Sequence, residues 1–161
     1  MRQRLWSGLV LAMWLGCAGR PSTPVQSEVP AAEAPAPANV PVTRPVLVTQ
    51  TPAPKDPIGI QEAGVRGDVL EVQVRHPGGC KAHTYELQWN GSIQKSESGE
   101  AQAELVLRHD ANGDNCEALF DFALSFDLTP FKQRWKELSG SEHGAVLLRL
   151  ANSEATARYT F

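Results

Sequence analysis

Residues 117–128 read EALFDFALSFDL, and this run decides the fold of the chain. Every second position from Phe120 to Phe126 is apolar, which is the period of a β-strand with one buried face. Leu119 and Ala123 place further apolar side chains on the opposite face. A strand that is apolar on both faces lies inside a sheet and not at its edge. We therefore expect this strand to be central.

The same alternation recurs on both sides of the central run. It appears at residues 70–74, 85–89, 103–107, 146–150 and 157–161. The Asn152-Ser153 pair between the last two segments predicts a closing hairpin, and residues 58–65 form a candidate seventh strand. No segment of 12 residues shows the apolar period of an amphipathic helix. Phe131 and Trp135 lie among basic residues, and we interpret them as two core anchors of a solvated loop or helical turn.

These patterns predict an all-β fold, a single antiparallel β-sandwich of immunoglobulin-like proportions. A small barrel is the alternative architecture. The sandwich is expected at residues 58–161, and these 104 residues suffice for one hydrophobic core. They hold ten Lys or Arg against fifteen Asp or Glu, a net charge of −5, so we expect no nucleic-acid partner.

The stretch before this domain has the composition of a tether. Residues 18–57 hold ten of the chain's 12 prolines and no aromatic residue. Such a segment buries no core, so we expect it to be extended and disordered, a stalk for the domain. A proline-rich ligand for a recognition module is the alternative.

The first 17 residues have the pattern of an export signal. Arg2 and Arg4 precede an apolar run at residues 5–15, which is followed by a glycine and Cys17. A helix needs roughly 20 apolar residues to cross a bilayer, so this run is too short to be a membrane anchor. We interpret residues 1–17 as a signal peptide.

Leu15, Gly16 and Cys17 resemble the lipobox of bacterial lipoproteins, although Trp14 stands where that motif usually has leucine. The resemblance implies that Cys17 carries lipid, such as palmitate, and that this anchor holds the chain on a membrane. Ala18 takes the place of the aspartate that marks inner-membrane retention, which favours the outer membrane. Ordinary cleavage beside Cys17 would instead release a soluble periplasmic protein.

Four chemically distinctive side chains are expected at one end of the sandwich. If the strand at 85–89 pairs with the next strand as a hairpin, His83 lies opposite His109. The following turn returns the chain at Cys116, beside His109, and Cys80 lies three residues before His83. Alternation places His83, His109 and Cys116 on the core side.

Two interpretations are possible for the side chains at this end of the sandwich, a disulfide and a zinc site. Cysteines of exported proteins are usually oxidised, and a Cys80–Cys116 disulfide closes a loop of 36 residues, which stabilises by about 3–4 kcal/mol through chain entropy. Alternatively, Cys80, His83, His109 and Cys116 supply two thiolates and two imidazoles, a set suited to tetrahedral zinc in a metal-binding envelope protein. We expect the disulfide, with the histidines as hydrogen-bonded polar residues.

A second metal interpretation concerns the turn itself. Asp110, Asn112 and Asp114 match the opening of a calcium loop, and Asp121 stands at its twelfth position. Asn115 replaces the glycine of the sixth position, and the flanking segments are strands and not helices. The Asn-Gly pair in this segment is itself a hairpin signal, so we expect a turn and no metal.

The sequence carries no motif of a catalytic or cofactor site. Residues 139–144 contain Ser, Glu and His, but a G-x-S-x-G elbow and a glycine-rich phosphate loop are both absent. We therefore expect no enzyme activity and no cofactor.

Three segments together resemble a known family. They are GGCKAHTYEL at residues 78–87, LRHDANGDNC at residues 107–116 and FDLTP at residues 126–130. They are similar to the C-terminal β-sandwich of NigD-like bacterial lipoproteins, and the similarity covers about half of the folded domain. It departs on the N-terminal side, where that family has an additional small β-domain and this chain has the tether.

The resemblance implies a lipoprotein of poorly understood role and adds no catalytic assignment. We therefore expect a lipid-anchored β-sandwich of the cell envelope that binds or supports a partner. That partner is either another envelope protein or a small ligand.

Overall fold

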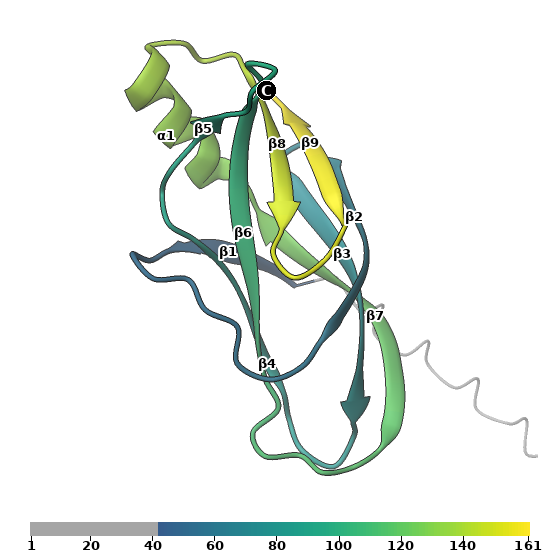
Figure 1. Cartoon of the computed structure of the whole chain (residues 1–161). Coiled ribbons are helices and arrows are strands. Elements are labelled where there is room, and N and C mark those ends of the chain that lie inside the picture. The colour runs from purple at the N-terminus through teal and green to yellow at the C-terminus, as the bar shows by residue number, and fades with distance from the viewer. Residues whose placement is uncertain (1–41) are drawn as a thin grey trace, which may run out of the picture. The chain divides into compact units, whose positions relative to one another are not determined.

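The computed structural model describes residues 42–161, which form a β-sandwich with one helix (Figure 1). The elements are β1 (Thr43–Val48), β2 (Gly59–Arg66), β3 (Val69–Gly78), β4 (Thr84–Trp89), β5 (Gln94–Lys95), β6 (Ala101–Asp110), β7 (Ala118–Asp127), α1 (Thr129–Ser139), β8 (Ala145–Leu150) and β9 (Thr156–Thr160). The strand order is β2-β3-β7-β1-β4-β6-β8-β9, with β5 paired to β6. The predicted all-β sandwich is confirmed, and each expected strand is present.

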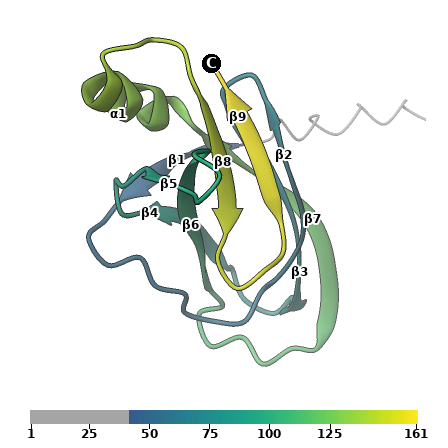
Figure 2. The same ribbon diagram turned by 45° about the horizontal axis from the view of Figure 1, so that its top comes forward.

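The pairing of the strands is mixed and not wholly antiparallel. β1 runs parallel to both β4 and β7, and β8 runs parallel to β6. Parallel neighbours need a crossover connection, and the segment from β7 through α1 to β8 supplies one of them. Figure 2 shows β9 beside β2, and these outer strands contact each other, so the sandwich approaches a barrel on this side.

The core lies between two sheets, one formed by β2, β3 and β7 and the other by β4, β6, β8 and β9. β3 and β7 pair in a register that sets Leu70 against Phe126 and Val72 against Leu124. These four side chains are at most 2% exposed. β7 lies between β3 and β1, as its apolar sequence predicts, but its second face is open and Leu119 is 68% exposed.

β1 corrects the expected boundary between tether and domain. Residues 43–45 pair with β7 and residues 46–48 pair with β4, so β1 joins the two sheets into one continuous sheet. The prediction that residues 18–57 are disordered throughout is therefore wrong for residues 42–57. The hydrogen bonds of β1 are made with the edges of β4 and β7, which are distant in sequence, so the local composition does not reveal this strand. Residues 18–41, the signal peptide and Cys17 lie outside the described residues.

The helix α1 is the element that the apolar pattern did not predict. Pro130 stands in its first turn, and Gly140 ends it with φ of 70° and an N–H bond to the Lys136 carbonyl. Only Phe131 is fully buried, so the helix has no apolar stripe to detect. No helix among residues 42–161 is long and apolar enough to cross a membrane.

Candidate functional site: a histidine pocket

Three histidines meet where β3 ends, β4 begins and β6 ends. His76 belongs to β3, His83 directly precedes β4 and His109 belongs to β6. One ring nitrogen of each histidine lies within 4.8 Å of one ring nitrogen of both others. His83 and His109 meet, with His83 Nδ1 and His109 Nε2 2.9 Å apart, but the predicted register is wrong because Tyr85, and not His83, lies opposite His109. We call this group the histidine cluster.

His76 is the member that the sequence analysis missed. It continues the alternation of Val72 and Val74 on the core-facing side of β3, and it is 4% exposed. That parity was the signal that could have found it, because a histidine in an apolar series must find polar partners inside the fold.

Two glycines allow the cluster to close. Gly78 and Gly79 have φ of 151° and 114°, a backbone region that side chains other than hydrogen rarely permit. A Cβ atom on Gly78 would lie 2.5 Å from His83 Cε1, and one on Gly79 would lie 2.9 Å from the Phe120 ring. The Gly-Gly pair therefore lets β3 turn back directly against His83.

Backbone carbonyls set the tautomers of two of the rings. His76 Nδ1 donates to the Pro77 carbonyl at 2.8 Å, and His109 Nδ1 donates to the Pro57 carbonyl at 2.9 Å. In each neutral ring the Nε2 atom is therefore left with a lone pair. Burial lowers the pKa of His109 and outweighs the hydrogen bond to the Pro57 carbonyl, which raises it, so the ring stays neutral at pH 7.

Asp114 orients the third ring. Its Oδ2 atom lies 3.1 Å from His83 Nε2 and accepts the N–H groups of residues 79–81, each at 2.9 Å. Its Oδ1 atom accepts the N–H of Cys116, and the side chain is 0% exposed. The Cys116 N–H, followed by those of Lys81 and Cys80 and by His83, holds the pKa of Asp114 well below its ordinary value. The carboxylate is therefore charged at neutral pH.

The predicted disulfide is present between Cys80 and Cys116, whose Cα atoms are 5.9 Å apart. It joins the β3–β4 loop to the β6–β7 loop, the segments that carry His83 and Asp114. Because the two sulfur atoms are bonded to each other, the alternative zinc set of two thiolates and two imidazoles does not form. The cysteines position the site and do not provide ligands.

The segment with the calcium-like pattern is a tight turn. Asn112 and Gly113 both have positive φ, 52° and 64°, and the Asp114 N–H bonds to the Ala111 carbonyl at 2.9 Å. Lys81 Nζ donates to the carbonyls of Asn112 and Gly113 at 3.0 and 2.8 Å. This lysine thus ties the turn to the β3–β4 loop.

The carboxylates of that pattern point to different partners. Asp110 forms an ion pair with Lys55 at 2.7 Å, whereas Asp121 pairs with Arg75 at 2.7 Å on the surface of the sheet. Asp114 turns toward His83 and the β3–β4 loop. The arrangement of a calcium loop, with its oxygen ligands converging on one point, is therefore absent from this segment.

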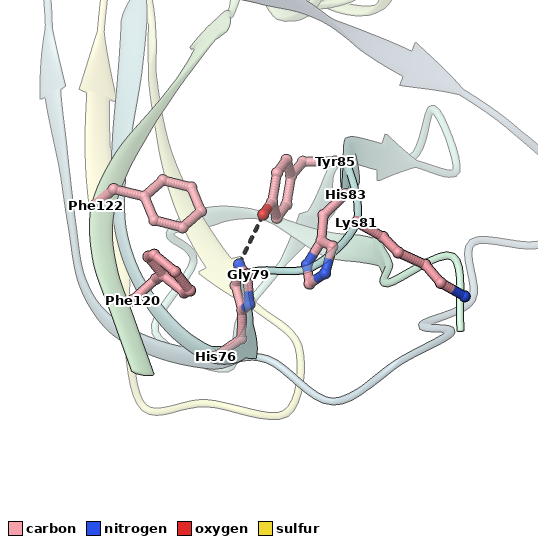
Figure 3. Close-up of a pocket in the computed structure, with 7 residues that line it drawn as sticks. All are labelled: His76, Gly79, Lys81, His83, Tyr85, Phe120 and Phe122. Atoms are coloured by element: carbon pink, nitrogen blue, oxygen red, sulfur yellow. Dashed lines mark hydrogen bonds between the residues drawn. The ribbon is translucent and has the colours of Figure 1, made fainter. Parts of the chain in front are cut away.

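A cavity of about 190 Å³ opens beside the histidine cluster. Its lining residues are His76, Gly79, Lys81, His83, Tyr85, Phe120 and Phe122 (Figure 3). The Tyr85 hydroxyl donates to His76 Nε2 at 2.6 Å, and burial raises the pKa of Tyr85, so this hydroxyl keeps its proton. We call this cavity the histidine pocket.

The site is preorganised by its own hydrogen bonds. Every buried side-chain nitrogen and oxygen atom among residues 42–161 has a hydrogen-bond partner. Tyr85 also stacks on His109 with ring centroids 5.3 Å apart, in the register that places these two residues opposite each other. The rings are therefore held in place before any ligand arrives.

Fold and site together define a small disulfide-bonded β-sandwich domain with a histidine-lined pocket at one end. Comparison with known families gives this class a more specific identity. The chain belongs to the family of NigD-like C-terminal β-sandwich domains, whose sequence profile matches residues 40–153. The match confirms the resemblance carried by the three sequence segments. It also begins before β1, in agreement with the corrected domain boundary.

Solved structures with similar folds include three from Bacteroides species. A NigD-like immunity protein from Bacteroides caccae has 18% identity and a TM-score of 0.47, over 67% of this chain and 52% of that one. A protein of unknown function from Bacteroides vulgatus has 22% identity and a TM-score of 0.42, over 76% and 56%. A candidate lipoprotein from Bacteroides fragilis has 9% identity and a TM-score of 0.49, over 74% and 68%.

The chain thus spans between 52% and 68% of the length of these structures. A search of the curated proteins found no match.

Proposed function

We propose that this chain is a lipid-anchored, non-enzymatic binding protein of the bacterial cell envelope, and that its ligand occupies the histidine pocket. The observation that carries the proposal is the pocket itself. It is concave, has aromatic walls formed by Phe120 and Phe122, and has a few polar groups held in fixed orientation. That combination is typical of sites for small ligands or protruding side chains.

The location in the cell envelope is supported by two features, the first 17 residues and the disulfide. Residues 1–17 have the order of a signal peptide, and Cys17 stands at the position that lipobox cysteines occupy. The Cys80–Cys116 disulfide suits the oxidising compartments of exported proteins. Ala18 favours the outer membrane, and the alternative is a soluble periplasmic protein.

The absence of catalysis is supported by the character of the pocket lining. Its side chains include no serine, cysteine or carboxylate that could act as a nucleophile. Lys81 lines the pocket, but its ammonium group is bonded to the carbonyls of Asn112 and Gly113. The imidazoles of His76 and His83 and the Tyr85 hydroxyl are already engaged in hydrogen bonds, so the lining is suited to binding a ligand.

Palmitate labelling tests the anchor. In a bacterial host fed labelled palmitate, the wild-type chain should take up label and sediment with the outer membrane. Cys17→Ser should lose the label and appear in the soluble periplasmic fraction, because no other cysteine stands at a lipobox. A double variant, Cys80→Ala with Cys116→Ala, is the matched control and should keep its label. Undiminished labelling of Cys17→Ser would disprove the anchor.

Capture from envelope extract tests the binding role. Phe120 is 43% exposed and forms a wall of the pocket. Leu138 is 55% exposed, lies on α1 and does not line the pocket. Wild type and Leu138→Glu should retain the same small molecule or protein, identified by mass spectrometry. Phe120→Glu should lose it, because a charge replaces the aromatic wall. Retention of the same species by all three chains would rule out the pocket as the ligand site.

A further inference from the structure

We infer that His76, His83 and His109 bind a first-row transition-metal ion, Zn²⁺ or Cu²⁺, at the base of the histidine pocket. The inference rests on the proposed function in one respect, because it names the class of ligand that the same pocket takes. It does not depend on the lipid anchor. Its ligand set differs from both metal sets that the sequence suggested, since it includes His76 and excludes both cysteines.

The first argument is the convergence of three nitrogen atoms. One nitrogen from each ring lies within 4.8 Å of the others, and His83 Nδ1 and His109 Nε2 are 2.9 Å apart. A tetrahedral ion that holds two nitrogens at about 2.0–2.1 Å sets them about 3.3 Å apart. His83 and His109 therefore need to separate by only a few tenths of an ångström to admit an ion, and the His76 nitrogen completes the set by moving toward them.

The second argument is the set of oxygen atoms behind the rings. A metal-bound histidine normally donates its other N–H to a carbonyl or carboxylate oxygen, which fixes the ring and its tautomer. Each ring has such a partner here, namely the Pro77 carbonyl, the Pro57 carbonyl and the Asp114 carboxylate. The bonds behind His83 and His109 leave for an ion the two nitrogens that face each other, and His76 Nε2 becomes a ligand when the Tyr85 hydroxyl that donates to it is displaced.

The third argument is the charge and the burial of the site. The rings of His76 and His109 are 4% and 1% exposed, and a buried cation needs compensation. The Asp114 carboxylate, with its side chain 0% exposed and bonded to His83, supplies a negative charge directly behind one ligand. The site therefore combines three imidazole rings with one fixed anion, which suits a divalent ion.

The identity of the ligands restricts the ion. Calcium and magnesium prefer oxygen ligands, and the three converging atoms are nitrogens. Imidazole suits zinc and copper, and copper(II) binds such sites more tightly than zinc. Three protein ligands leave a fourth position, and the open cavity beside His76 and Tyr85 gives water or a donor atom of a ligand access to it.

Metal titration of the full chain, purified in detergent without a polyhistidine tag, tests the inference. Calorimetry with ZnCl₂ and CuCl₂ should give one ion per chain for the wild type. His76→Phe and His109→Phe should each weaken binding at least 100-fold, because each removes a ligand. His143→Gln is the matched control, since His143 is exposed and belongs to no cluster in the part of the chain that the structure describes. It should bind like the wild type.

A spectroscopic measurement keeps the test decisive where a variant fails to fold. The electron paramagnetic resonance spectrum of the wild type with one equivalent of Cu²⁺ should show nitrogen coupling from the three rings, unchanged in His143→Gln. Failure of the wild type to bind either ion, or a nitrogen spectrum that disappears in His143→Gln, would overturn the site.

The two proposals fail separately. A chain that binds an ion but takes no palmitate contradicts the anchor and supports the metal site. A chain that retains an envelope partner through Phe120 but binds no ion supports the binding role and overturns the metal site.

Discussion

The two ends of the β-sandwich are built from the same strands and hold opposite chemistry. β4 begins beside His83 and ends at Trp89, which stacks on Phe131 of α1 with ring centroids 3.9 Å apart. β3 likewise runs from the buried Leu70 to His76. Figure 1 shows α1 at one end and the loops that join β3 to β4 and β6 to β7 at the other. We call these the helix end and the histidine end.

The difference shows how one small domain divides stability from binding. At the helix end, large rings are removed from water and their free energy comes from burial and close packing. At the histidine end, polar rings are buried only because every one has a hydrogen-bond partner, and an open pocket remains beside them. The first arrangement stabilises the sandwich, and the second leaves a surface on which a ligand can act.

Removing the central ring of the helix end should have the largest effect on stability. Phe131→Ala should lower the free energy of unfolding by about 3–5 kcal/mol, because it leaves a cavity beside Trp89. Urea denaturation followed by tryptophan fluorescence measures this. Leu138→Ala, on the same helix but 55% exposed, is the control and should change stability by no more than about 0.5 kcal/mol. Equal losses in both variants would show that the helix end is not a packed core.

At the histidine end, the disulfide should contribute most to stability. Replacing Cys80 and Cys116 together by alanine should cost about 3–4 kcal/mol, because a loop of 36 residues is released in the unfolded chain. The same denaturation experiment measures the loss, and the wild type under a reducing agent should match the double variant. A loss below about 1 kcal/mol would mean that hydrogen bonds alone hold the two loops together.

A single methyl group at Gly78 should disturb the histidine end selectively. Gly78→Ala should destabilise by about 1–3 kcal/mol, because φ is 151° and the new atom would press on His83. The same substitution should change the chemical shifts of the His83 imidazole in NMR spectra. Gly64→Ala is the matched control, since a Cβ there meets nothing within 4 Å, and its stability should rise slightly or stay unchanged. Unmoved histidine signals in Gly78→Ala would contradict the close packing.

The smallest expected effect is the pH dependence of stability that Asp68 contributes at the helix end. The hydrogen bond from Lys132, and then that from Tyr159, lowers the pKa of Asp68 in the folded chain. This stabilisation is present above the pKa of Asp68 in the unfolded chain and is lost as the pH falls through its lower folded value. Asp68→Asn should therefore melt below the wild type at pH 7, and the difference should narrow as the pH falls toward 2. Equal Tm values at pH 7 would contradict the interaction.

Much of the fold could be predicted because alternation is a local property. The strands at residues 70–74, 85–89 and 103–107 all appear, and the parity that placed His83 and His109 on one side is correct. The same parity extends to His76, which the sequence analysis did not single out. These features depend on neighbours in the chain, which the order of residues contains directly.

Other features depend on which distant segments become neighbours. β1 is a strand only because β4 and β7 accept it between them, and α1 is a helix held chiefly by one buried ring, Phe131. No local pattern encodes either event.

The sequence alone therefore predicted the class of the fold, the end of the sandwich where the site lies and the pairing of Cys80 with Cys116, for which a zinc set was the alternative. Only the tertiary structure decided that His76 joins His83 and His109, and that the Pro57 carbonyl and Asp114 fix their rings. The physical reason is range. Alternation can be read from neighbouring residues, and the oxidation of cysteines follows from the cellular compartment. A cluster of rings depends instead on hydrogen bonds between residues as far as 52 positions apart.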